Sequence, residues 1–337
     1  MKKWVTFLII SIVAVLLTAC GESEGSSSGS GKGNYPNSTI TIVAPTSAGG
    51  GWDLTARAIA KNLSETKLVE KPIVVENKPG GGGVTFMATF ATKEANNDYM
   101  LMVKSPPIII NNLKSEGNSQ FGFRDTTPLA QLTKDYGAIA VKADSKYQTL
   151  FDLLEDIKRD PKSVTLAGAS SPGSMDHLIT ILPVYKYGID PKSVKYVSFD
   201  GGGESVALLG GNADAIGTDV STISQYVKSR QVRVLAVTAP ERVSIEGLED
   251  VPTLKELGLD TEFTIWRGIF GPKEMSQEAK EYWIEKLTAL NETEEWKEDL
   301  ARNGWQQEFK SGEEFEKFLE EQEVVISDLL KALGMHK

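Results

Sequence analysis

The segment IVAPTSAGGGWDLTARAIAKNL, from Ile42 to Leu63, joins a strand pattern to a helix pattern through a glycine-rich loop. Its apolar run ends at Pro45, and three glycines follow at Gly49–Gly51. Beyond them, apolar residues between Ala56 and Leu63 recur at i, i+3, i+4 and i+7, the spacing of a helix face that packs on a core. A strand, a loop and a helix in this order predict one unit of an α/β fold, with the loop at the carboxyl end of the strand.

The same alternation of short apolar runs and helix patterns continues along the chain and predicts mostly parallel sheets flanked by helices. Two runs of it, ending near Leu132 and near Gly258, indicate two lobes with a cleft between them. A helical C-terminal part is expected after FTIWRGIFGP (Phe263–Pro272). The predicted strands are Thr39–Pro45, Pro72–Asn77, Tyr99–Lys104, Gly137–Ala143, Ser163–Ala169, Val194–Phe199, Asp214–Asp219 and Val232–Thr238.

Composition excludes several classes of function for this chain of 337 residues. A net charge of −10 argues against binding to nucleic acid, which needs a basic surface. One cysteine and two histidines exclude cysteine-rich zinc sites, CxxC redox pairs and disulfides within the chain. The glycine clusters fit neither a nucleotide phosphate loop nor the GxGxxG dinucleotide pattern, so we expect no metal and no cofactor.

The N-terminus, MKKWVTFLIISIVAVLLTAC, has two lysines followed by an apolar run, as a secretory signal does. The run is short for a membrane span, and its end, Leu17–Cys20, is similar to a bacterial lipobox. We expect a signal peptide over 1–19, a lipidated Cys20 and a flexible Gly/Ser tether over 20–35, which places the folded part outside the cell membrane. A plain signal peptide or a single-span anchor is the alternative.

The first loop is a candidate anion site that needs neither Lys nor Arg. Glycines let a ligand approach the main chain, and the N-terminus of the following helix adds a partial positive charge. We expect this helix to start near Asp53, which either caps it or braces the loop. A glycine-rich turn without a ligand is the alternative.

Two further loops follow strands in the same way. SSPGSMDHL (Ser170–Leu178) has small hydroxylated residues, a glycine and a helix start, and FDGGGESVALLGGNADAIGTD (Phe199–Asp219) contains another glycine cluster. His177 is the only histidine well inside the predicted fold. A triad built on Ser171 or Ser174 with this histidine lacks the GxSxG elbow, so we expect the imidazole to bond the loop or to line the cleft.

A series of motifs in a definite order covers essentially all of the chain from Tyr35 onward. In these motifs the chain resembles the solute-binding proteins of tripartite tricarboxylate transporters, often called the Bug family. They are IVAP (Ile42–Pro45), GGWD (Gly50–Asp53), AR (Ala56–Arg57), VVENKPGGGG (Val74–Gly83, with Lys78 in place of Arg), GSMDH (Gly173–His177), LLGGNAD (Leu208–Asp214), VRVLAVT (Val232–Thr238), VPTLKELG (Val251–Gly258) and WRGIFGP (Trp266–Pro272).

The resemblance implies a two-lobed Venus-flytrap fold similar to that of type II periplasmic binding proteins, each lobe a mostly parallel sheet flanked by helices. Residues 36–138 and 262–337 would form the first lobe, and residues 139–261 the second. Two segments would cross between the lobes, near Leu132–Ala140 and Leu259–Arg267.

The resemblance also implies a small carboxylate held mainly by backbone N–H groups of the first two loops, with assisting waters. The chain departs from the family pattern at Pro106-Pro107, where family members usually lack paired prolines. The resemblance therefore leaves open whether Ser105, just before this pair, contacts the ligand, and we expect the pair to reshape ligand specificity. The positions carried over as ligand-binding are Thr46, Ser47, Ala48, Gly49, Gly50, Asp53, Ser170, Ser171, Gly173, Ser174, His177, Gly203 and Asp219.

The expected function is that of a monomeric solute-binding lipoprotein without enzymatic activity. It captures a di- or tricarboxylate, an amino acid or an aromatic acid, and delivers it to the membrane permease of a tripartite transporter. The alternatives are a ligand-sensing subunit that docks on a membrane signalling protein and a secreted hydrolase that uses Ser174 and His177.

Overall fold

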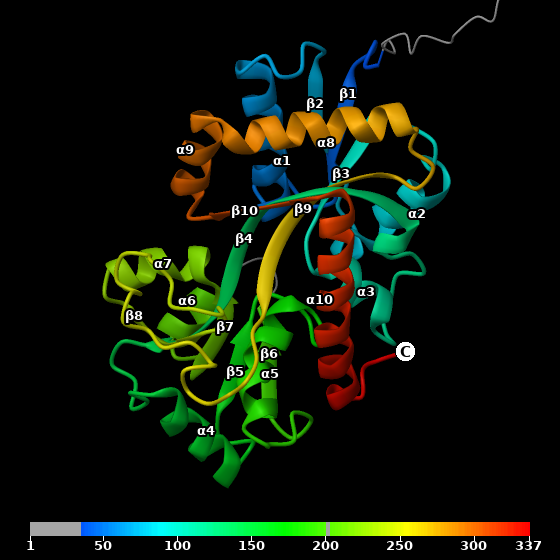
Figure 1. Ribbon diagram of the computed structural model, residues 1–337. Coiled ribbons are helices and arrows are strands. Elements are labelled where there is room, and N and C mark those ends of the chain that lie inside the picture. The colour runs from blue at the N-terminus through cyan, green and yellow to red at the C-terminus, as the bar shows by residue number, and fades with distance from the viewer. Residues whose placement is uncertain (1–34, 200–202) are drawn as a thin grey trace, which may run out of the picture. The chain divides into compact units, whose positions relative to one another are not determined.

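The computed structural model describes residues 35–199 and 203–337 (Figure 1). The predicted signal peptide, Cys20 and most of the tether lie outside the described residues, as do Gly201 and Gly202. Residues Tyr35–Lys337 form one compact unit. No helix in the described ranges is both long and apolar enough to cross a membrane.

Within the described residues, ten strands form a mixed sheet in the order β2-β1-β3-β9-β4-β7-β5-β6, with β8 and β10 also paired to β4. All eight predicted strands are present, with ends shifted by a residue or two or, for one, as part of a longer strand. The strands are β1 (Ile40–Ala44), β2 (Ile73–Asn77), β3 (Met100–Lys104), β4 (Thr126–Lys142), β5 (Thr165–Gly168), β6 (Lys195–Ser198), β7 (Ala215–Asp219), β8 (Val232–Val237), β9 (Thr264–Pro272) and β10 (Gln306–Ser311).

Helices follow most of the strands, as α/β architecture requires. Short 3-10 helices precede α2 and β4, at Gly81–Gly83 and Phe123–Asp125. The α-helices are α1 (Gly51–Glu65), α2 (Val84–Thr92), α3 (Pro107–Leu113), α4 (Leu150–Arg159), α5 (Met175–Lys186), α6 (Glu204–Leu209), α7 (Val220–Lys228), α8 (Gln277–Glu292), α9 (Glu294–Asn303) and α10 (Gly312–Leu333).

Parallel pairing is confined to two separate halves of the sheet. In one half β1 pairs with β2 and β3, and in the other β5 pairs with β6 and β7. Each antiparallel pair involves β4 or β9. The predicted α/β class with mostly parallel halves is therefore confirmed, and the antiparallel strands lie where the halves join.

The long strand β4 belongs to both halves of the sheet. Its first part, Thr126–Tyr136, pairs with β9, and its second part, Gly137–Lys142, pairs with β7 and β8. The sequence predicted the second part alone. The segment FTIWRGIFGP, which was expected only to introduce the C-terminal helices, contains strand β9. The C-terminal part, expected to be helical, also contains strand β10.

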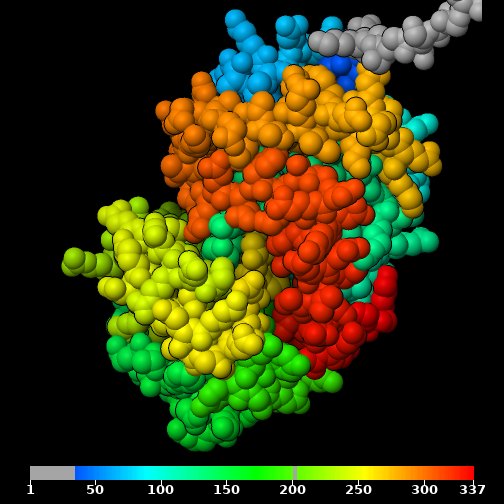
Figure 2. All heavy atoms as spheres, in the orientation of Figure 1, coloured from blue at the N-terminus to red at the C-terminus, as the bar shows by residue number. Residues whose placement is uncertain are grey.

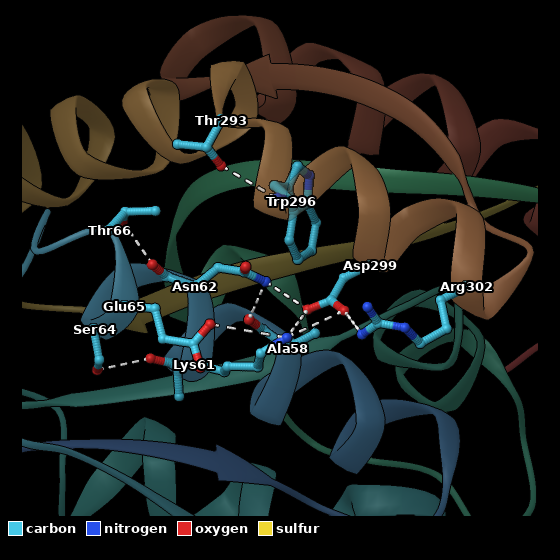
Figure 3. A network of polar contacts seen from close by, with 11 residues as sticks. Ala58, Lys61, Asn62, Ser64, Glu65, Thr66, Thr293, Trp296, Asp299 and Arg302 are labelled. Carbon is cyan, nitrogen blue, oxygen red and sulfur yellow. Dashed lines mark hydrogen bonds and ion pairs between the residues drawn. The ribbon is translucent and has the colours of Figure 1, made fainter.

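Helices α8 and α9 pack beside α1, and a buried carboxylate connects α9 to α1 (Figure 3). The side-chain amide of Asn62 donates to Asp299 at 2.7 Å, and the ammonium of Lys61 lies 3.3 Å from the same carboxylate. Arg302 also pairs with Asp299. Because Asp299 is only 3% exposed, these partners compensate a charge that would otherwise be costly to bury.

The last helix, α10, contacts β4, α3 and α5, and it lies at the surface of the face seen in Figure 2. The residues after it continue this link. The N–H of Ser115 donates to the carbonyl of Met335 at 2.7 Å, and the N–H of Lys337 donates to that of Leu113 at 2.9 Å. A Cβ atom on Gly173 would stand 3.0 Å from the sulfur of Met335, so the tail also touches the loop before α5.

Candidate ligand-binding cleft

Two adjoining cavities lie beyond the carboxyl ends of β1, β3, β5 and β7. Their volumes are about 550 Å³ and 250 Å³. Trp52, Pro107 and Met175 line both, so the cavities share a wall and form one cleft. Ligands of open α/β sheets bind at this edge.

The larger cavity is bounded by segments from both halves of the sheet. Ser170, Ser171 and Ser174 come from the loop between β5 and α5. Gly82 and Asn111 come from the 3-10 helix before α2 and from α3. Hydroxyl and amide groups therefore face an otherwise largely apolar space, a common arrangement in small-molecule sites.

The smaller cavity is reached by the loop between β1 and α1, which we call loop 1 (45–50). Thr46 of loop 1, Gly51 at the start of α1 and Ser105 after β3 line it. Asp219 at the end of β7 and Arg267 of β9 complete its charged lining. This cavity thus holds groups of both charge signs.

Asp53 braces loop 1 rather than contacting either cavity. Its carboxylate accepts from the N–H of Gly49 at 2.8 Å, from Arg57 Nε at 3.0 Å and from Asn77 at 2.8 Å. Burial acts to raise the pKa of Asp53, but the bonds from Arg57, Gly49 and Asn77 outweigh it, and the pKa lies below its usual range. Helix α1 begins at Gly51, two residues before the predicted start.

Some backbone N–H groups of loop 1 and the first turn of α1 bond within the loop, and others are left free at the cleft. The N–H of Gly49 is bound to Asp53, and the N–H of Gly50 donates to the carbonyl of Ser47 at 3.2 Å. The N–H groups of Gly51 and Trp52 have no acceptor among the described residues. The free positive end of α1 is therefore its first turn, which borders the smaller cavity.

The loop between β5 and α5, here loop 2 (169–174), is held by hydrogen bonds from both ends. Ser170 Oγ accepts from the N–H of Asp176 at 2.9 Å, and Tyr196 donates to the Ser170 carbonyl at 2.8 Å. His177 Nδ1 accepts from the N–H of Gly173 at 2.9 Å. The histidine therefore bonds the loop, one of the two roles that the sequence predicted.

The hydrolase alternative lacks a general base in this geometry. Burial lowers the pKa of His177 to about 4, and its Nδ1 is occupied by Gly173. Ser174 Oγ lies 3.2 Å from Ser171 Oγ instead. A serine nucleophile needs a base within hydrogen-bond reach, and neither serine is hydrogen-bonded to a base among the described residues.

The remaining predicted positions are spread around the cleft. Thr46 and Asp219 line the smaller cavity, and Ser170, Ser171 and Ser174 line the larger one. Ser47 and Ala48 are exposed at the outer side of loop 1. Gly203 caps α6 outside the lining of both cavities.

The family described as "Tripartite tricarboxylate transporter family receptor" matches residues 55–335. The chain belongs to this family. Among its relatives is Protein BugT of Bordetella pertussis, which is 26% identical over 79% of this receptor and 78% of its own length.

Solved structures share the fold. A TctC solute-binding protein from Polaromonas, 25% identical, covers 88% of this receptor and 99% of its own chain with a TM-score of 0.73. MatC from Rhodopseudomonas palustris with bound malate, 21% identical, covers 88% and 100% with a TM-score of 0.70. The likeness confirms the predicted two-lobed fold of periplasmic solute-binding proteins, and it makes this receptor a member of a solute-binding rather than an enzymatic family.

Sequence reasoning missed the cationic groups of the cleft in this receptor. It found no Lys or Arg in the loops, whereas Arg267 reaches the smaller cavity from β9 and Lys114 reaches the larger one from the end of α3. The motif WRGIFGP contains Arg267, yet only the pairing of β9 beside β3 and β4 brings it to the cleft.

A buried lysine lies behind the wall that the two cavities share. Lys104 Nζ stands 4.3 Å from the centre of the Trp52 ring, a cation–π contact. Burial lowers the pKa of this ammonium to about 7. Trp52 Nε1 in turn donates to Ser105 Oγ at 2.9 Å, so the hydroxyl of Ser105 is engaged by the receptor itself.

Two buried carboxyl groups interact with Asp219, and one of them, Asp176, lines the larger cavity. Burial raises the pKa of Asp176 to about 8, and the charges of Asp219 and Glu204 add to the rise. Burial raises the pKa of Asp135 to about 7, again with a contribution from Asp219. No group of three or more His, Cys, Asp or Glu side chains within residues 35–199 and 203–337 is arranged to hold a metal ion.

Proposed function

We propose that this receptor captures a small organic carboxylate in its cleft and delivers it to the membrane permease of a tripartite transporter. The observation that carries the proposal is the convergence of the α1 N-terminus, Arg267 and the serines of loop 2 on one cleft. These are donor groups, and donors with positive ends suit an anion. MatC, which shares the fold, is described with bound malate, itself a carboxylate.

A thermal-shift screen tests ligand capture. The purified full-length chain is unfolded and refolded to remove co-purified ligand, and it is then heated with di- and tricarboxylates, amino acids and aromatic acids. A ligand at about 100 times its dissociation constant adds about 2.7 kcal/mol and raises the unfolding temperature by several degrees. A flat response to all the acids, with neutral sugars as the comparison, would sink the proposal.

We further propose that Cys20 carries a lipid that anchors the receptor to the outer face of the cell membrane. The motivation is the lipobox-like end of the apolar N-terminal run. Replacing Cys20 by Ala is expected to move the receptor from the membrane fraction to the soluble fraction of bacterial cells that express it. Retention in the membrane fraction at the wild-type level would argue for an uncleaved anchor instead.

Lobe closure is the proposed switch between capture and delivery. Residues 36–138 with 262–337 would move against residues 139–261, with β4 and β9 as the crossing strands. Small-angle scattering of the refolded protein is expected to give a smaller radius of gyration once a ligand from the screen is added. An unchanged radius at saturating ligand would contradict closure.

A further inference from the structure

Arg267 is a buried guanidinium without a hydrogen bond among the described residues. Its side chain is 9% exposed, and its Nη1 atom is buried with no partner. The nearest carboxylate oxygen, on Asp219, stands 3.7 Å from Nη2, beyond hydrogen-bond distance. A guanidinium has five N–H donors, and leaving them unsatisfied is costly in a buried position. The guanidinium of Arg267 can therefore donate hydrogen bonds to an acceptor on a ligand.

The guanidinium lies against the free end of α1. A Cβ atom on Gly51 would stand 3.2 Å from Arg267 Nη2, so the guanidinium lies close to the backbone at the start of α1. The N–H groups of Gly51 and Trp52, in the first turn of that 15-residue helix, have no acceptor among the described residues. Two positive features therefore meet at one wall of the smaller cavity, and a single carboxylate would satisfy both.

Asp219 adds the opposite charge to the same cavity. It lines the 250 Å³ space together with Arg267, and its carboxylate accepts no hydrogen bond from the described residues. Burial raises the pKa of Asp219, and the charge of Arg267 opposes that rise. A cationic group of a ligand would act in the same direction as Arg267 and favour the ionised carboxylate.

We propose that the smaller cavity binds the zwitterionic head of an amino acid, with its carboxylate on Arg267 and the first turn of α1 and its ammonium on Asp219. The inference rests on the proposed function and narrows its ligand class. An α-amino acid carries its two charged groups on one carbon atom, which suits a cation and an anion that stand 3.7 Å apart. A plain carboxylate would satisfy Arg267 but would face Asp219 with a like charge.

The rest of the ligand has a place in the same geometry. Trp52, Pro107 and Met175 form the wall shared with the larger cavity, so a side chain can pass from one space to the other. The hydroxyls of Ser170, Ser171 and Ser174 lie in the larger space. These groups favour a polar side chain on the amino acid.

Calorimetry with matched acids tests the inference on the wild-type full-length chain after refolding. Aspartate is compared with succinate and glutamate with glutarate, since each pair differs only in the amine. The amino acid of at least one pair is expected to bind about tenfold or more tightly than its partner. Succinate or glutarate binding as tightly as the amino acid would overturn the inference and leave the proposed function standing. If neither these acids nor the wider acid panel binds, both proposals fail.

Two variants test whether the preference for an amino acid over the matched acid depends on the charges of Asp219 and Arg267. In Asp219→Asn the affinities of the paired acids are expected to converge, and in Arg267→Gln both members are expected to weaken about tenfold or more. The matched control is Arg242→Gln, which removes an exposed arginine paired with Glu256 and is expected to keep wild-type affinities. An undiminished amine preference in Asp219→Asn would overturn the inference. If a variant does not fold, the comparison of amino acids with their matched acids on the wild-type chain still tests the inference.

Discussion

At the scale of single residues, the carboxylate of Asp53 connects three segments of the chain. It holds the N–H of Gly49 in loop 1, the guanidinium of Arg57 one turn further along α1, and the amide of Asn77 at the end of β2. The ligand side of loop 1 thus depends on a residue that faces away from it.

We expect Asp53→Ala to lower the free energy of unfolding by about 1–3 kcal/mol, because three part-buried hydrogen bonds lose their acceptor. Urea denaturation at pH 7 measures the change. The matched control is Asp144→Ala, because the Asp144 carboxylate is 74% exposed and pairs with Lys142 at the surface. This variant should stay within about 0.5 kcal/mol of wild type. Equal effects of the two substitutions would show that Asp53 does not brace the loop.

Asp176 gives stability a distinct dependence on pH. Its pKa is about 8 in the folded protein and 3.8 without burial, so the unfolded chain releases the proton first as the pH rises. The stability that comes from its protonated form is complete below pH 3.8 and is lost as the pH rises through about 8. We expect Asp176→Asn to gain stability relative to wild type between these values.

Urea denaturation of both proteins at pH 5, 7 and 9 would measure this gain. Asp135, whose folded pKa is also raised, contributes a slope of the same sign to both proteins and cancels in the difference. A difference between variant and wild type that stays constant across the pH series would contradict the assignment.

The residues of the site were only partly predictable from the sequence. Thr46 and Ser170 come shortly after strands and Asp219 ends one. The rule that the carboxyl ends of parallel strands meet at one edge of the sheet placed all three near the cleft. Arg267 lies within a strand and reaches the cleft through sheet pairing, for which no local pattern exists. The occupation of the Gly49 N–H by Asp53 is likewise a matter of side-chain geometry.

At the scale of elements, two of the three segments that the sequence missed as strands carry several polar residues. The first part of β4 contains Pro128 and the buried polar residues Gln131 and Thr133. Strand β10, QQEFKS, is polar and pairs only with β4. Strand prediction rests on runs of apolar residues, and the polar positions of these two segments interrupt such runs.

The junction of α9 with α1 depends on one buried carboxylate. We expect Asp299→Ala to lower the free energy of unfolding by about 2–4 kcal/mol, because Asn62, Lys61 and Arg302 all lose their acceptor. Guanidinium denaturation measures it. Glu298→Ala changes the neighbouring acid of the same helix, which is exposed, and should have little effect. A loss below about 0.5 kcal/mol for Asp299→Ala would mean that apolar packing alone joins the helices.

At the scale of the whole molecule, the C-terminal tail connects the segment after α3 with loop 2. We expect deletion of residues 334–337 to speed hydrogen exchange in residues 105–120 and 168–180, because the bonds at Ser115 and Leu113 and the contact at Gly173 are lost. Exchange in residues 40–65 should not change.

Mass spectrometry of deuterated peptides measures the effect of the deletion. The control is Lys331→Ala, which alters an exposed side chain near the end of α10 and leaves the tail in place. Uniformly faster exchange in the deletion, including residues 40–65, would indicate global loss of stability rather than a local connection.

The fluorescence of Trp52 can report on the occupancy of the cleft. Its indole is part of the wall between the two cavities, and its ring centre lies 4.3 Å from the ammonium of Lys104. Trp266, Trp283 and Trp296, by contrast, are fully buried and line neither cavity. A ligand that enters changes the polarity and the charge around this ring, and also around Trp305, whose ring centre lies 5.1 Å from the guanidinium carbon of Arg267. The emission of an indole responds to both changes. Intrinsic tryptophan fluorescence can therefore follow ligand binding and release by the receptor in real time, without an added dye.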